Sequence, residues 1–255
     1  MLDRLRNWQS RMFWSRLFAR PLAIALLYPI ADLPWVTPNV LTHLGNLNFG
    51  AGIAAMWLGH DVAAAVFLQI HLIFDNMDGT LARYRGCETS FGSYYDKISD
   101  ALGISAMFLS LGWLAFERDP SRPHLIAVGA IIAINQILLG YSKWVTVAAH
   151  LKQGTASTSV HQGAVPPPTR TPVQWALWFF DSLARIALFE EADYFLWVGL
   201  ALILGRLDWV LYLLAAAGTV DLLVTVVRRG IEAAVMDAAE RTNLGAGPLP
   251  GRTAR

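Results

Sequence analysis

Four aspartates within an otherwise apolar stretch constrain this chain more than any other feature. They lie in the segment FDNMDGTLARYRGCETSFGSYYDKISDALG, from Phe74 to Gly103, as the pairs Asp75 and Asp78, then Asp96 and Asp100. Residues three or four apart share one face of a helix, so each pair is expected to project from a single helix face. A carboxylate in a membrane helix is energetically costly and by default marks a functional site. The segment therefore predicts two helices that direct their acidic residues toward a common site.

The composition indicates that these helices cross a membrane. Hydrophobic residues make up 55% of the 255 residues, charged residues make up only 15%, and the mean hydropathy is +0.42. These values are typical of an all-α polytopic membrane protein. The formal net charge of +1 offers no basic field for a nucleic acid, so no nucleic-acid partner is expected. The one cysteine, Cys87, forms no disulfide framework, and we interpret it as a bystander thiol rather than a metal ligand.

Apolar segments predict a membrane bundle of six transmembrane helices. These cover residues 38–59, 62–84, 91–116, 124–148, 175–204 and 209–227, each to within about three residues. In the fifth, Trp175–Phe189 is either its early part or a second interfacial helix, and Tyr194–Leu204 continues it. A polar loop rich in Ser, Thr, Pro and Gly precedes it at residues 150–172.

The ends of the chain differ from this bundle. Residues 1–20 mix arginines with leucines and aromatic residues, which predicts an amphipathic helix in the headgroup layer with its arginines toward anionic lipid. Pro21–Pro34 is apolar but short, so we interpret it as interfacial or re-entrant, with a true first span as the alternative. Three parts are expected: a juxtamembrane segment at 1–35, a transmembrane domain at 36–230 and a cytoplasmic tail at 231–255.

The distribution of basic residues predicts the orientation. Six spans place both termini on one side. That side collects the N-terminal arginines, Arg83, Arg85, Lys152 and Arg170, and the other side holds Arg118, Arg122 and Arg206. An excess of Lys and Arg marks the cytoplasmic side. We therefore expect an integral protein of a bacterial or archaeal cytoplasmic membrane, with both termini and the aspartates facing the cytoplasm.

The aspartates are suited to a divalent metal ion. Hard ions such as Mg²⁺ and Mn²⁺ prefer oxygen ligands, and two such ions can neutralise the charge that develops on a diphosphate. Asp75, Asp78 and Asp96 are the clearest ligand candidates, and Asp100 is a further one. Spacing does not distinguish a metal ligand from a base that takes a proton from an alcohol.

The residues between the aspartates indicate phosphate binding. Arg83 can form two parallel hydrogen bonds with phosphate oxygens, which a lysine cannot do. Gly79 and Gly92 would let a phosphate group approach the backbone closely, and Ala82 is also small. Together with the carboxylates, these residues predict a site for a phosphate-bearing substrate.

Written as one pattern, the segment reads D-x2-D-G-x2-A-R-x8-G-x3-D-x3-D. Every fixed position is filled, by Asp75, Asp78, Gly79, Ala82, Arg83, Gly92, Asp96 and Asp100. The pattern specifies eight residues over 26 positions. A chance cluster of carboxylates at helix ends is therefore a weak alternative explanation. The pattern resembles the signature of the CDP-alcohol phosphotransferase family, which are integral-membrane enzymes of phospholipid synthesis.

The resemblance implies a reaction and its participants. A substituted phosphate group would pass from a CDP-linked donor, either CDP-diacylglycerol or a CDP-alcohol, to an alcohol acceptor, with release of CMP. Asp100 would be the base that takes the acceptor's proton. The nucleotide and its phosphates would be bound by Asp75, Gly79, Ala82, Arg83 and Gly92. The implied partners are these substrates, membrane lipids and a second copy of the chain in a homodimer.

The first predicted bundle helix adds a polar face to the site. Thr37 and Pro38 form a strong helix start, and Asn39, Thr42 and Asn46 then share one face. The wording TPNxLTxxG resembles the first span of the family, whose polar face helps to line the nucleotide pocket. Asn46 is therefore a candidate nucleotide ligand, with a helix–helix hydrogen bond as the alternative. His43 and His71 are expected to make packing hydrogen bonds.

The acceptor is less constrained. An acceptor that carries a phosphate would need a basic pocket, for which Lys143, Arg185 and Arg228 are candidates; ordinary anchors at the cytoplasmic side are the alternative. The FDNMDG and PWVTPN wording also resembles choline and ethanolamine phosphotransferases, but Lys97 stands where those enzymes usually have His. The segment that runs from RPLA to TPN, residues 20–39, instead resembles the members of the family that use inositol phosphate as acceptor.

A transporter or ion-binding membrane protein with an intramembrane carboxylate cluster is the competing class. Carboxylates at the bilayer midplane on broken helices would favour it. Here the aspartates lie toward one side of the membrane, next to Gly79 and Arg83, and this combination favours the enzyme.

Overall fold

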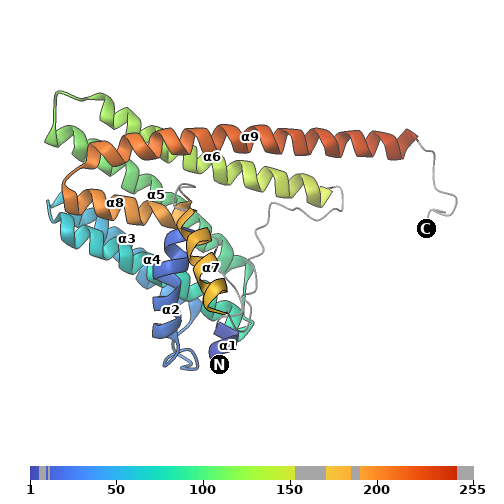
Figure 1. Ribbon diagram of the computed structural model, residues 1–255, viewed down its shortest axis with the longest axis horizontal. Coiled ribbons are helices and arrows are strands. Elements are labelled where there is room, and N and C mark those ends of the chain that lie inside the picture. Colours follow the sequence, from blue (N-terminus) through green and yellow to red (C-terminus); the bar gives the residue numbers. More distant parts are fainter. Residues whose placement is uncertain (6–9, 11, 153–170, 185–189, 246–255) are drawn as a thin grey trace.

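The described part of the chain folds into helices (Figure 1). The computed structural model describes residues 1–5, 10, 12–152, 171–184 and 190–245, and these ranges contain no strand. The helices are α1 (Leu2–Leu5), the π-helical turn η1 (Ser15–Ala19), α2 (Arg20–Leu27), α3 (Pro38–Trp57), α4 (Asp61–Arg85), α5 (Ser90–Arg118), α6 (His124–Lys152), α7 (Pro172–Ala184), α8 (Glu191–Leu204) and α9 (Leu207–Gly245). The all-α prediction is confirmed.

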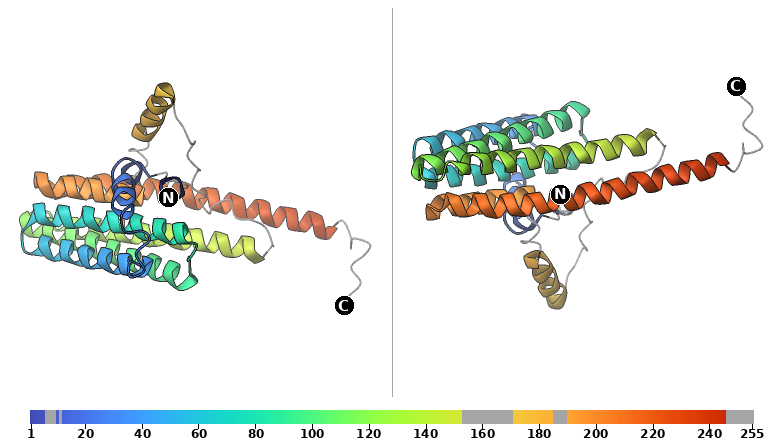
Figure 2. Two further views of the ribbon diagram at one scale, coloured as in Figure 1. Left: turned by 90° about the horizontal axis from the view of Figure 1, so that it is seen from below. Right: turned by 90° about the horizontal axis from the view of Figure 1, so that it is seen from above.

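Helices α3, α4, α5, α6, α8 and α9 run alongside one another, α2 lies across them, and α7 projects away from the bundle (Figures 1 and 2). Within the bundle α3 packs on α4 and α5 on α6, while α8 covers α4 and α9 covers α6. Their common core consists of buried aliphatic and aromatic side chains, among them Leu68, Met107, Phe108, Leu111, Ile132, Val198 and Leu211. Because lipid is as apolar as these side chains, their close packing, rather than their removal from water, stabilises the bundle within a membrane.

Three helices of the described chain are long and apolar enough to cross a membrane. They are α5, α6 and α9 over Leu207–Ala238. Polar residues interrupt α3 and α4, and α8 has 14 residues. A helix of that length is about 21 Å long, against a hydrocarbon core of about 30 Å. The structure therefore supports half of the six expected spans, and the other three remain predictions.

The N-terminal segment lies on the bundle. Only α1, η1 and α2 are described there as helical, and residues 6–9 and 11 lie outside the described residues. The predicted amphipathic helix over residues 1–20 is therefore not confirmed. Within Pro21–Pro34, α2 ends at Leu27 after eight residues, which is about 12 Å and too short to cross a membrane.

Helix α9 continues well past the expected end of the last span near residue 227. It runs to Gly245, so that α6 and α9 reach farther than the other helices on the side where α4 ends (Figure 1). The extension reads IEAAVMDAAERTNL after Gly230, with no proline and several alanines and glutamates. These residues have high helix propensity, so the arginines at 228 and 229 mark a change of polarity rather than the end of the helix.

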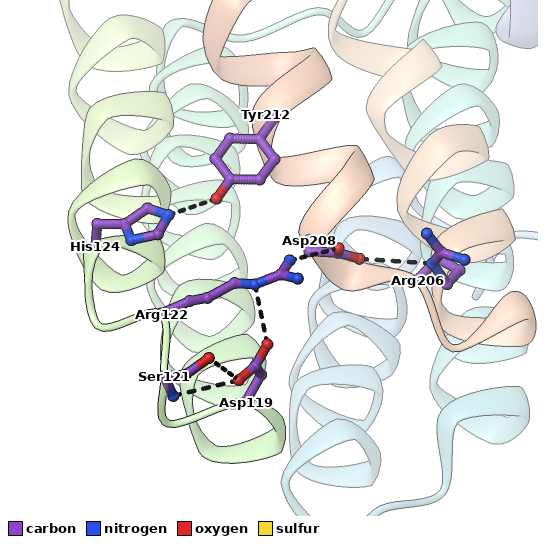
Figure 3. A network of polar contacts seen from close by, with 7 residues as sticks. All are labelled: Asp119, Ser121, Arg122, His124, Arg206, Asp208 and Tyr212. Carbon is purple, nitrogen blue, oxygen red and sulfur yellow. Dashed lines mark hydrogen bonds and ion pairs between the residues drawn. The ribbon is translucent and has the colours of Figure 1, made fainter.

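At the opposite end of the bundle, polar contacts join the turn between α5 and α6 to the start of α9 (Figure 3). Arg122 pairs with Asp119 and with Asp208, at 3.0 Å in each case. The Ser121 hydroxyl donates a hydrogen bond to Asp119 and lowers the pKa of this exposed carboxyl. His124 contacts the Tyr212 hydroxyl beside them. Exposed ion pairs contribute about 0 to 1 kcal/mol each. This network therefore orients the α5–α6 turn relative to the start of α9 more than it stabilises the fold.

Two glycines allow the backbones of α5 and α6 to approach each other closely. A Cβ atom at Gly129 of α6 would lie 2.5 Å from the Phe108 carbonyl oxygen, and one at Gly112 of α5 would lie 2.9 Å from the Leu125 carbonyl oxygen. Real Cβ atoms do not approach backbone oxygens so closely. The two backbones therefore touch because both positions lack a side chain, which is the usual device for tight helix packing in membranes.

We expect Gly129→Ala to lower the melting temperature of the detergent-purified protein by about 2 to 10 °C, because an overpacked contact costs about 1 to 3 kcal/mol. Gly140→Ala is the matched control on the same helix, since nothing lies within 4 Å of a Cβ atom there. That variant should keep or raise the melting temperature, because alanine has the higher helix propensity. Equal melting temperatures for both variants would contradict the tight contact.

Candidate active site

A tight hairpin between α4 and α5 brings the two aspartate pairs together. Gly86, with φ of +63°, ends α4, and Cys87 donates a backbone hydrogen bond to the Ala82 carbonyl at 3.1 Å. Thr89 then caps α5 by accepting a hydrogen bond from the Gly92 backbone at 3.0 Å. A glycine in the left-handed conformation commonly ends a helix, and a threonine cap commonly begins one. The chain reverses within four residues, so the last turns of α4 face the first turns of α5.

Three of the four aspartates form one cluster. One carboxylate oxygen from each of Asp75, Asp78 and Asp96 lies within 4.8 Å of the others. Asp78 is buried, and the other two are half-buried. Asp100 lies one turn farther along α5, within electrostatic reach of Asp75 and Asp96. Close, hard oxygen donors on facing helices fit a site for Mg²⁺ or Mn²⁺.

Helix α3 holds Asp78 in place. The Thr42 hydroxyl donates a hydrogen bond to one oxygen of the Asp78 carboxylate, and the Gly79 backbone N–H donates to the other. The predicted polar face of α3 therefore meets the cluster through Thr42. Orientation of a carboxylate by a hydrogen bond is typical of the outer shell of a metal site.

Arg83 and Gly79 form a unit one helical turn apart. A Cβ atom at Gly79 would lie 3.4 Å from both terminal nitrogens of the Arg83 guanidinium, so the guanidinium lies over the glycine. Arg83 is also within electrostatic reach of Asp75 and Asp78. The Arg83 guanidinium, which can donate two parallel hydrogen bonds, therefore lies beside the carboxylates and over the Gly79 backbone.

Gly92 is required by its own helix cap. A Cβ atom there would lie 3.0 Å from the Thr89 hydroxyl oxygen that caps α5, and 3.6 Å from the Asn39 side-chain oxygen. The structure therefore gives Gly92 a local role in closing the hairpin against α3. Its predicted contact with the nucleotide, like that of Ala82, stays a prediction.

Asn46 makes the interhelical hydrogen bond considered as the alternative to nucleotide binding. Its side-chain nitrogen donates to the Tyr95 hydroxyl of α5 at 3.2 Å, and His43 contacts the same hydroxyl at 3.0 Å. His71 lies against the Gly45 carbonyl at 3.1 Å, as expected for a packing histidine. Tyr95 was missed in the sequence, although its position next to Asp96 could have indicated it.

The N-terminal segment contacts α4, the helix that carries Asp75 and Asp78, and the sequence pattern did not reveal this contact. Ser15 donates to Asn76 at 2.6 Å, and Arg4 donates to the Tyr84 carbonyl at 2.7 Å. Arg20 is buried and donates to Thr80 at 3.3 Å. Burial and the nearby charge of Arg83 lower the pKa of the Arg20 guanidinium to about 10. The expectation that these arginines face anionic lipid is therefore wrong for the buried Arg20.

The predicted acceptor residues do not all converge. Lys143 of α6 is half-buried and lies within electrostatic reach of Lys97 and Glu191. Arg228 is exposed and lines an apolar groove on α9, whereas its neighbour Arg229 donates to Ser142 of α6 at 2.7 Å. Arg185 lies outside the described residues.

The bundle and its site define a class: membrane-embedded helical proteins with an acidic, arginine-flanked site. The sequence profile of the family described as CDP-alcohol phosphatidyltransferase matches residues 35–220. The chain therefore belongs to the CDP-alcohol phosphatidyltransferase family, whose members are membrane transferases of phospholipid synthesis.

Curated relatives carry a more particular name. The chain is 31% identical over 131 residues to the phosphatidylinositol phosphate synthase of Corynebacterium glutamicum, covering 50% of this chain and 60% of the relative. It is 35% identical over 106 residues to the protein of the same name from Mycobacterium tuberculosis, covering 40% and 48%. A third match, from Mycolicibacterium smegmatis, is 29% identical over 137 residues. The chain thus spans about half the length of the curated relatives it matches.

We expect Thr42→Val to lower CMP release from a CDP-linked donor by about 10- to 100-fold, because a hydrogen bond to a charged group contributes about 1.5 to 3 kcal/mol. Valine has the shape of threonine but cannot donate to Asp78. Thr42→Ser keeps the hydroxyl and should retain most of the activity. Equal activity of the valine and serine variants would show that α3 does not orient Asp78.

Proposed function

We propose that the chain transfers a substituted phosphate group from a CDP-linked donor to an alcohol and releases CMP. The observation that carries this proposal is the convergence of Asp75, Asp78 and Asp96 within 4.8 Å, with the Arg83 guanidinium over Gly79 beside them. A diphosphate needs cations and forked donors where its charge develops, and this arrangement offers both a cation site and a donor.

The residues divide the work as follows. Divalent ions, as the family generally requires, would be held by Asp75, Asp78 and Asp96 and would neutralise charge on the donor's diphosphate. Arg83 binds the phosphate oxygens and keeps the diphosphate aligned. Asp100, one turn deeper on α5, accepts the proton of the acceptor hydroxyl as it attacks phosphorus. A new phosphoester bond forms, the anhydride bond breaks, and CMP leaves with the electron pair.

The acceptor that we propose carries a phosphate on a polyol, and the donor is CDP-diacylglycerol. Two observations support this choice: the half-buried Lys143 on α6 near the site, and the similarity to proteins named phosphatidylinositol phosphate synthase. Arg229 lies within electrostatic reach of Lys143 and adds positive charge to the same region. Arg185 and Arg228 complete the set of candidates for binding the acceptor's phosphate.

We also propose that all six predicted spans cross the membrane, with α8 as the last part of the fifth, and that the active protein is a homodimer. The termini and the site then face the cytoplasm, where CDP-linked nucleotides and polar acceptors are available. The basic residues near the site support this orientation. A lipid-linked donor can enter from the side, because the site lies between bundle helices.

CMP release by the purified protein tests the proposed function. The assay supplies CDP-diacylglycerol, CDP-choline or CDP-ethanolamine separately with Mg²⁺ or Mn²⁺, each across a panel of phosphorylated and unphosphorylated alcohols. Release that requires CDP-diacylglycerol and a phosphorylated polyol supports the full proposal. Release with CDP-choline or CDP-ethanolamine and diacylglycerol would overturn the proposed substrates. Ion uptake into proteoliposomes without CMP release would favour the transporter class.

We expect Asp100→Asn to lower CMP release by about 1,000-fold, within the range for loss of a general base, while Mn²⁺ binding persists. Asp78→Asn should abolish both CMP release and Mn²⁺ binding, because Asp78 belongs to the close cluster. The contrast between these variants separates the base from the ligands. Full activity in either variant would overturn its assigned role.

We expect Lys143→Gln to raise the KM for a phosphorylated acceptor by about tenfold or more, since a charge-assisted hydrogen bond is lost. The KM for the CDP-linked donor should not change. Lys152→Gln, at the exposed end of the same helix, is the control. Arg228→Gln should have the smaller effect, because Arg228 lies on the exposed apolar groove. An unchanged acceptor KM in Lys143→Gln would remove this residue from the acceptor site.

A further inference from the structure

Lys97 occupies an unusual place among the aspartates. Its ammonium group lies 2.8 Å from an oxygen of Asp96 and 3.8 Å from an oxygen of Asp100. Adjacent residues on a helix do not face each other, so Lys97 must fold back along α5 to reach Asp96. The ammonium thereby bridges the two carboxylates of α5.

The same Asp96 carboxylate belongs to the cluster with Asp75 and Asp78. A divalent ion bound at this cluster would take an oxygen of Asp96 as a ligand. The Lys97 ammonium, 2.8 Å from the same carboxylate, would then be a like charge close to the ion. Lys97 and a divalent ion would therefore compete for Asp96.

Lys97 can withdraw from this position. Its side chain is 51% exposed, whereas that of Asp100 is 13% exposed, so the lysine stem has room to move while the carboxylate does not. Glu191, at the start of α8, lies within electrostatic reach of Lys97 and offers a second anionic partner. A displaced Lys97 would therefore still have an anionic partner in Glu191.

We propose that Lys97 is a built-in counter-ion that holds Asp96 and Asp100 until a divalent ion displaces it toward Glu191. It is a positioning residue, because it acts on the carboxylates. The inference rests on the proposed metal site and adds a control of ion affinity by the protein itself. Removing the lysine should tighten metal binding and destabilise the metal-free protein.

Mn²⁺ binding to the detergent-purified protein without nucleotide, followed by electron paramagnetic resonance, tests the inference. We expect Lys97→Gln to lower the Kd for Mn²⁺ by about tenfold or more, because one neighbouring charge changes the binding of a proton to a carboxylate by about 10- to 1,000-fold. Lys97→Arg keeps the charge and should stay within about threefold of the parent protein. Lys152→Gln is the control for a distant lysine.

A second variant and a second readout keep the test independent of folding. Glu191→Gln removes the alternative partner and should raise the Kd for Mn²⁺. The melting temperature of Lys97→Gln should fall without Mn²⁺ and recover when Mn²⁺ is added. An unchanged or higher Kd in Lys97→Gln overturns the inference alone. Mn²⁺ binding that survives Asp78→Asn overturns the proposed metal site and this inference with it.

Discussion

Like charge at short range is the constraint on which this structure depends. Carboxylates of Asp75, Asp78 and Asp96 lie within 4.8 Å of one another, and two such charges repel by about 3 kcal/mol at an effective dielectric constant of 20. The neighbouring side chains offset this repulsion. Thr42 donates to Asp78, Lys97 pairs with Asp96, and Arg83 lies over the adjacent turn. Hydrogen bonds and cations thus surround the cluster and offset the repulsion among its carboxylates.

Much of the site could be predicted because its information is local. The spacing of Asp75 and Asp78, and the turn between the aspartate pairs, specify two helix faces and a hairpin without knowledge of the rest of the chain. The Thr37 cap acts within three residues, so the sequence pattern shows it directly. The all-helical class followed from hydropathy for the same reason.

The contacts that were missed join distant parts of the chain. Tyr95 meets Asn46, and Arg20 meets Thr80, through packing that no local pattern encodes. Arg228 and Arg229 illustrate a second difficulty. Successive residues on a helix point about 100° apart. Arg228 therefore faces the exposed groove, whereas the next residue, Arg229, faces α6, and the sequence alone does not show which of the two does so. The length of α9 was underestimated because a change in polarity was taken as its end, although helix propensity continues.

The N-terminal segment helps to hold α4 in place. It contacts α4 through Ser15, Arg4 and the buried Arg20. Since α3 contacts Asp78 through Thr42, the part of α4 that carries the aspartates is held by contacts from more than one element. Such contacts would keep the carboxylates aligned during the proposed reaction.

The glycine contact between α5 and α6 has a mechanical consequence. Backbones that touch at Gly112 and Gly129 leave little room for α5 to slide along α6, so this contact helps to fix where Asp96 and Asp100 lie relative to Lys143. On the other side, Gly52 of α3 fits against Leu68 of α4, where a Cβ atom would lie 3.1 Å from the leucine. The aspartate cluster is thus carried by two packed helix pairs, α5 with α6 and α3 with α4. A shift of one pair against the other would change the spacing of the carboxylates, so contacts between the pairs, such as that of Asn46 with Tyr95, also hold the geometry of the cluster.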